Sequence, residues 1–97
     1  MVIKITKNVI EAANLLIDKE KRFHLAHFDP VAIALNQQTD FGSWFTNGEK
    51  AMLSSDESRF FDLPDNITKF LKNWESGNKV SPISFNIPDQ IAYITIE

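Results

Sequence analysis

The chain has 97 residues, of which 10 are Lys or Arg and 13 are Asp or Glu, giving a formal net charge of −3. This length fits one domain over residues 1–97, and 43% apolar residues suffice for one hydrophobic core. The absence of cysteine excludes disulfides, thiolate zinc sites and cysteine nucleophiles, and it favours a reducing, cytoplasmic setting.

The N-terminal part of the chain is predicted to form a strand followed by a helix. Val2–Ile5 has the composition of a short strand. Thr6 can then cap a helix over residues 7–21. The apolar residues of this segment recur at the spacing of one helical face: Val9, Ile10, Ala13, Leu16 and Ile17.

A second, shorter helix is predicted after the first. Residues 23–28 fit either a strand or a turn of helix, and the sequence leaves both open. Asp29 is followed by Pro30, a pair that suits a helix start because Asp can cap and Pro is preorganised for the first turn. We expect this helix to end near Gln38.

Residues 39–55 have the least regular pattern in the chain. An Asn-Gly pair at positions 47–48 favours a tight turn. Ser54 and Glu57 have capping-box spacing, which predicts a helical turn running through Phe61.

The C-terminal part predicts a helix and a β-hairpin. Pro64 is expected to open a helix that ends before Gly77, and its apolar stripe is Ile67, Phe70, Leu71 and Trp74. Residues 83–87 and 92–96 alternate between apolar and polar around a Pro-Asp turn. We therefore predict an α+β domain, in which a small antiparallel sheet of the N-terminal strand and this hairpin packs against about three helices.

One metal-like cluster can be identified, formed by His24, His27 and Asp29. On a helix the two histidines would share a face, whereas on a strand they would point to opposite faces. Catalytic zinc needs three protein ligands, and Asp29 already has a competing role as a helix cap. A small metal-dependent enzyme at this cluster is therefore the alternative hypothesis, and we predict no catalytic residue, cofactor or metal for the chain.

Most of the negative charge lies in one segment, residues 40–65. Its six acidic and two basic side chains give a formal charge of −4, and aromatic residues are interspersed among them. Acidic groups beside large apolar side chains are typical of a surface that contacts a basic partner. The candidate contact residues are Asp56, Glu57, Asp62 and Asp65, then Glu49 and Asp40, with Phe60 or Trp44 as an apolar anchor.

In size, composition and this acidic segment, the chain resembles the small phage-encoded anti-CRISPR proteins, several of which are acidic mimics of DNA. The resemblance rests on no sequence motif. It implies a non-enzymatic inhibitor that binds a Cas subunit and blocks recognition of target DNA. Spaced carboxylates can stand in for phosphates in a groove lined by Lys and Arg, so the expected partner is a nucleic-acid-binding complex.

The sequence also bears on other partners and on assembly. The acidic balance argues against direct nucleic-acid binding, and no apolar run has transmembrane length. We expect a monomer. A third possibility is a subunit of a larger assembly that adds strands to a partner through the edge of its C-terminal hairpin.

Overall fold

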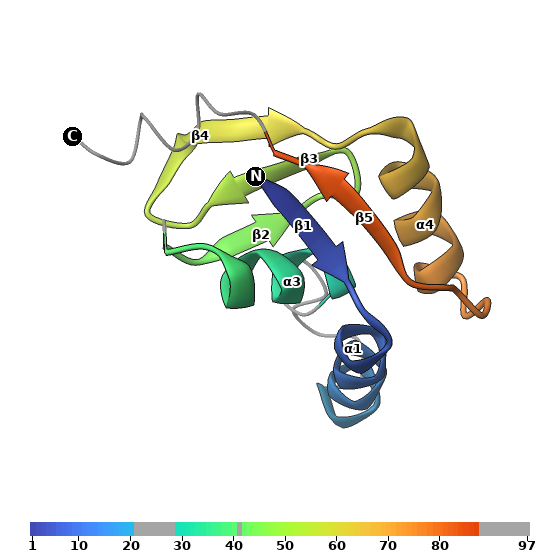
Figure 1. Cartoon of the computed structure of the whole chain (residues 1–97). Coiled ribbons are helices and arrows are strands. Elements are labelled where there is room, and N and C mark those ends of the chain that lie inside the picture. Colours follow the sequence, from blue (N-terminus) through green and yellow to red (C-terminus); the bar gives the residue numbers. More distant parts are fainter. Residues whose placement is uncertain (21–28, 41, 88–97) are drawn as a thin grey trace.

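The structure is a computed structural model that describes residues 1–20, 29–40 and 42–87 (Figure 1). Within these residues the chain forms three helices and two small antiparallel sheets, which confirms the predicted α+β class. In chain order the elements are β1 (Val2–Ile5), α1 (Lys7–Glu20), α3 (Pro30–Gln38), β2 (Trp44–Thr46), β3 (Lys50–Leu53), β4 (Asp56–Asp62), α4 (Asp65–Glu75) and β5 (Ile83–Asn86).

The first sheet joins the two ends of the described chain, as predicted. β1 pairs antiparallel with β5, with Val2 opposite Asn86 and Ile5 opposite Ile83. Beyond the strands, the Ile87 N–H donates to the Met1 carbonyl at 3.0 Å. The second strand of the predicted hairpin, residues 92–96, lies outside the described residues.

The second sheet was not predicted. It has the order β2-β3-β4, and both pairings are antiparallel. The expectation of irregular structure over residues 39–55 is therefore wrong, because β2 and β3 form a hairpin there. The predicted helical turn through Phe61 is also wrong. Ser54 lies in the turn between β3 and β4, and Glu57 belongs to β4, so the capping-box spacing is accidental.

The helix boundaries follow the predicted capping signals. The Thr6 hydroxyl accepts a hydrogen bond from the Val9 N–H at 3.2 Å, at the start of α1. Asp29 caps α3, and Pro64 is the residue just before α4. Gly77 follows the end of α4 with φ +85°, a left-handed conformation that favours glycine.

The core lies between the two sheets and the helices. Trp44 and Phe61 from the second sheet make an edge-on ring contact with centroids 5.4 Å apart. Phe61 also lies 6.4 Å from the ring of Phe85, which belongs to β5 in the first sheet. All three side chains are buried, so Phe61 links the two sheets through its ring contacts.

Two amide side chains at the end of α3 bind the backbone of a strand in each sheet. Gln38 accepts from the Lys4 N–H at 2.8 Å and donates to the Lys4 carbonyl at 2.7 Å. Asn36 accepts from the Trp44 N–H at 2.6 Å and donates to its carbonyl at 3.4 Å. Each amide therefore occupies strand hydrogen-bonding groups that another chain would otherwise be able to pair with.

Candidate functional site

The candidate site is the outer face of the three-stranded sheet, defined here by Phe45, Lys50, Met52, Phe60 and Asp62. The register places Phe45 opposite Met52 and Met52 opposite Phe60, so the three apolar side chains form one row across the strands. Their neighbours Trp44, Ala51 and Phe61 point to the buried face.

Phe60 is the most exposed member of this apolar row. Its side chain is 44% exposed, while Phe45 and Met52 are half-buried. Lys50 Nζ lies 4.7 Å from the centroid of the Phe60 ring and 2.6 Å from Asp62 Oδ1. The ammonium thus contacts an aromatic ring and a carboxylate at once, which orders the polar border of the row.

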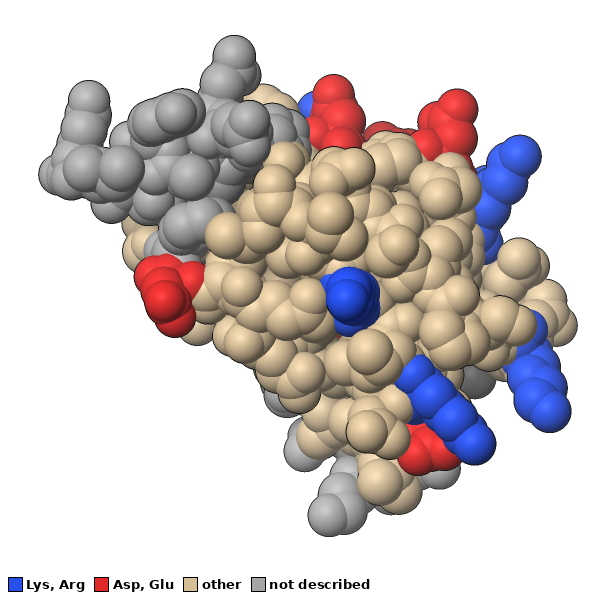
Figure 2. Space-filling view, in the orientation of Figure 1, with Lys and Arg blue, Asp and Glu red and all other residues tan. Residues whose placement is uncertain are grey.

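Three predicted contact carboxylates gather at one end of the sheet. The Leu63 N–H donates to the Glu49 carbonyl at 2.8 Å, which brings Glu49 beside the end of β4. Asp62 ends β4 and Asp65 begins α4, and all three side chains are exposed. Figure 2 shows acidic side chains along the rim where β4 ends and α4 begins.

The other predicted carboxylates lie elsewhere. Asp56 is opposite Leu53 and Asp62 is opposite Lys50, three residues away along β3, or roughly 10 Å. The register between β3 and β4 shifts between Met52 and Leu53, so β4 is irregular between Asp56 and Phe60. The side chains of Asp56 and Glu57 lie outside the described part of the structure. Asp40 is exposed on the segment that leads from α3 to β2. The acidic residues are therefore distributed along the sheet rather than gathered in one cluster.

Trp44 cannot serve as the exposed anchor, so that expectation is wrong. Its side chain is completely buried, and its Nε1–H donates to Thr39 Oγ1 at 3.0 Å. In each adjacent aromatic pair one ring is buried and the other is on the outer face: Trp44 and Phe61 are buried, and Phe45 and Phe60 lie on the outer face.

Asp29, the third residue of the hypothetical metal cluster, has a structural role inside the fold. It is 1% exposed, and its carboxylate accepts hydrogen bonds from the Ala32 N–H at 2.7 Å and from the Thr46 hydroxyl. Burial raises the pKa of Asp29 from 3.8 to about 7, and the charge of Glu75 acts in the same direction, while both hydrogen bonds oppose the rise. His24 and His27 lie outside the described residues, and those that are described contain no group of three potential metal ligands.

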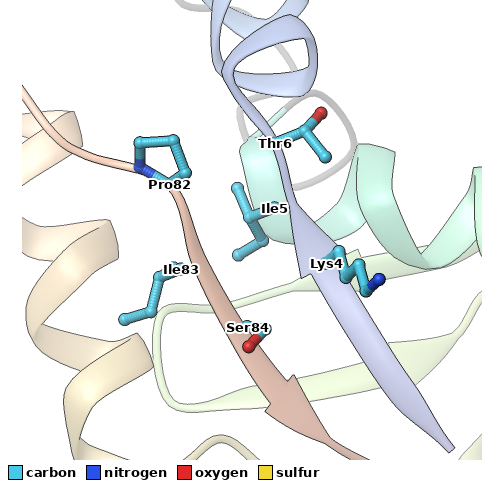
Figure 3. A pocket seen from close by; sticks show the side chains of 6 residues that line it. All are labelled: Lys4, Ile5, Thr6, Pro82, Ile83 and Ser84. Carbon is cyan, nitrogen blue, oxygen red and sulfur yellow. The ribbon is translucent and has the colours of Figure 1, made fainter.

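Two hollows on the described surface lack a catalytic arrangement. A shallow hollow of about 310 Å³ lies where β1 and β5 meet, lined by Lys4, Ile5, Thr6, Pro82, Ile83 and Ser84 (Figure 3). Lys4 is the one charged residue among these six. A hollow of about 200 Å³ between α4 and the β2–β3 turn includes Glu49, Lys72 and Glu75. Neither hollow places an acid or base beside a nucleophile.

Sequence reasoning missed three members of the outer face: Phe45, Lys50 and Met52. The available signal was the alternation of inward- and outward-facing residues within each short strand. This alternation shows which side chains share a face only when the pairing of the strands is known. The pairing itself depends on the turns at residues 47–48 and 54–55.

Comparison of the chain with models of protein families, with curated proteins and with solved structures finds no match. Within the described residues, no helix combines the length and the apolar character needed to cross a membrane. The outer face is therefore the feature of this chain that bears most directly on its function.

Proposed function

We propose that the protein is a non-enzymatic binding module that docks on another protein through the outer face of its three-stranded sheet. The observation that carries this proposal is the half-exposed Phe60 at the end of a cross-strand apolar row. An aromatic side chain that remains exposed beside polar groups is typical of an interaction surface.

The charges around the row indicate the chemistry of the partner. Glu49, Asp62 and Asp65 lie beyond Phe60 at one end of the sheet. Lys50 is 40% and Asp62 78% exposed, so their ion pair is solvated and contributes little stability. An Arg or Lys of the partner can therefore replace Lys50 at Asp62 at small cost. The complementary surface is basic around an apolar pocket that receives Phe60.

A nucleic-acid-binding complex supplies a basic surface of this kind. In this proposal the carboxylates occupy positions that phosphates would take, and the bound module prevents DNA or RNA from entering the groove, as in anti-CRISPR proteins that mimic DNA. Asp56 and Asp62 face Leu53 and Lys50 of β3, so the acidic positions are spread along the sheet by roughly 10 Å. We propose that the protein acts as a monomer in the cytoplasm.

The test begins with affinity capture from a cell extract, followed by mass spectrometry of the retained proteins. The proposal expects one nucleic-acid-binding complex, which Phe60→Ala fails to retain and which added DNA displaces. Leu15→Ala is the matched control, because Leu15 is 64% exposed on α1, away from the sheet.

A second variant tests the charges. Glu49→Lys combined with Asp65→Lys should slow association and reduce its dependence on salt. Retention that is unaffected by Phe60→Ala, or reduced equally by Leu15→Ala, would refute the assignment of the outer face. Unchanged association kinetics in the charge variant would refute the electrostatic part alone.

A further inference from the structure

A pocket of about 260 Å³ lies between the start of α1, the end of α4 and the segment that leads to β5. Its lining residue Trp74 is at the opposite end of α4 from Asp65, so the pocket is separate from the outer face. Figure 1 shows the two ends of α4. We call this cavity the α1–α4 pocket. The residues that line it include Lys7, Ile10, Glu11, Trp74, Lys79 and Val80.

The floor of the α1–α4 pocket is apolar and held in place. Ile10 and Trp74 are almost completely buried, and Val80 is half-buried beside them. The Trp74 Nε1–H donates to Asn14 Oδ1 at 2.8 Å, which fixes the indole ring relative to α1. A ligand that contacts this ring therefore meets an indole whose polar N–H is already satisfied.

The rim of the pocket is more basic than the chain as a whole. Lys7 and Lys79 line it together with one carboxylate, Glu11, so its formal charge is +1 in a chain of net charge −3. Lys7 is also the first residue of α1, where the helix dipole favours an anion. An apolar floor beneath a positively charged rim is complementary to a molecule that carries an apolar group and a negative charge.

From this complementarity we propose that the α1–α4 pocket binds a small amphipathic carboxylate. Its aryl or short alkyl group lies on Trp74 and Val80, and its carboxylate lies between Lys7 and Lys79. The ligand is smaller than a drug-sized molecule, because the pocket volume of about 260 Å³ is below the roughly 300 Å³ at which the range of ligand pockets begins. This activity is independent of the outer face.

Two-dimensional ¹H–¹⁵N NMR provides a test with an internal control. The chain has two tryptophans and therefore two indole N–H signals, one beside the pocket and one in the core. Titration with 3-phenylpropionate should shift the Trp74 indole signal saturably and leave the Trp44 signal unchanged. The neutral analogue 3-phenylpropionamide has the same apolar group and should bind more weakly.

Variants at the rim assign the carboxylate contact. Lys7→Gln and Lys79→Gln should each weaken binding of 3-phenylpropionate about two- to fivefold. Lys69→Gln is the control, because Lys69 is exposed on α4 and does not line the pocket. The proposal is overturned by the absence of a saturable Trp74 shift, by equal affinity for the acid and the amide, or by an equal effect of Lys69→Gln.

Discussion

Replacing Asp29 with Asn should change how the stability of the protein depends on pH. Burial of this carboxyl raises its pKa from 3.8 to about 7, so the folded protein keeps a proton that the unfolded chain has already lost. The folded state therefore binds more protons between these pH values, and the free energy of unfolding falls as the pH rises through them. The destabilising effect of the charged Asp29 is complete about one pH unit above this folded pKa of about 7.

The size of the effect follows from the two pKa values. The difference between 3.8 and about 7 corresponds to about 4 kcal/mol at high pH. About 3 kcal/mol of this develops between pH 5 and pH 8.5. The amide introduced by Asp29→Asn would be neutral throughout, and its side-chain oxygen can still accept from the Ala32 N–H. Between pH 5 and pH 8.5, the free energy of unfolding of Asp29→Asn should therefore rise by about 3 kcal/mol relative to that of the wild type.

The assay is urea denaturation of both proteins at several pH values, followed by tryptophan fluorescence. Groups that titrate identically in the two proteins cancel in the difference, so the difference isolates Asp29. Asp40→Asn makes the same chemical exchange at an exposed position and serves as the control for the substitution itself. A difference between Asp29→Asn and wild type that stays constant from pH 5 to pH 8.5 would refute the account of Asp29.

Three further predictions concern the fold. Gln38→Ala removes both hydrogen bonds to the Lys4 backbone, so it should lower the free energy of unfolding by about 1–2 kcal/mol and increase aggregation in light scattering; unchanged values for both would contradict the edge-covering role. Trp44→Ala should cost about 3–5 kcal/mol and Phe60→Ala about 1 kcal/mol or less in urea denaturation, and equal costs would contradict the assigned burial. Gly48→Ala should cost about 1–2 kcal/mol in the same assay, because Gly48 has φ +90° with open space around it; a stabilised variant would contradict a strained turn.

The predicted elements that proved correct have local causes. Asp29 with Pro30, and Pro64 with Gly77, mark helix ends through hydrogen bonding and backbone preferences that act within a few residues. The pairing of β1 with β5 was expected from the strand composition of residues 2–5 and the alternation of residues 83–87. Such signals can be seen in one sequence without knowledge of the packing.

The second sheet could not be predicted in the same way. β2 has three residues and β3 has four, which is too few for alternation to stand out from chance. In β4 the adjacent residues Phe60 and Phe61 are both apolar, although Phe61 is buried and Phe60 is exposed. The sequence therefore shows no alternation between apolar and polar residues at this point. The sheet brings Trp44 of β2 and Phe61 of β4 into ring contact from non-adjacent strands, and this packing outweighs the local capping-box signal of Ser54.

The candidate site was predictable only in part for the same reason. Acidic composition selected the segment that contains β3, β4 and Phe60, but the register decides which side chains share a face. It groups Phe60 with Phe45 and Met52, and it separates the start of β4 from Asp62. The α1–α4 pocket had no comparable signal, since Lys7 and Lys79 lie at opposite ends of the chain.

The central claim is that the outer face of the three-stranded sheet contacts another protein. Its most direct test is photocrosslinking in a cell extract, with p-benzoylphenylalanine placed at position 60 or, as the control, at position 15. We predict that Phe60→p-benzoylphenylalanine forms a covalent adduct with one protein, that added DNA reduces the adduct, and that the same substitution of Leu15 forms none. No adduct at position 60, or the same adduct from both positions, would contradict the claim.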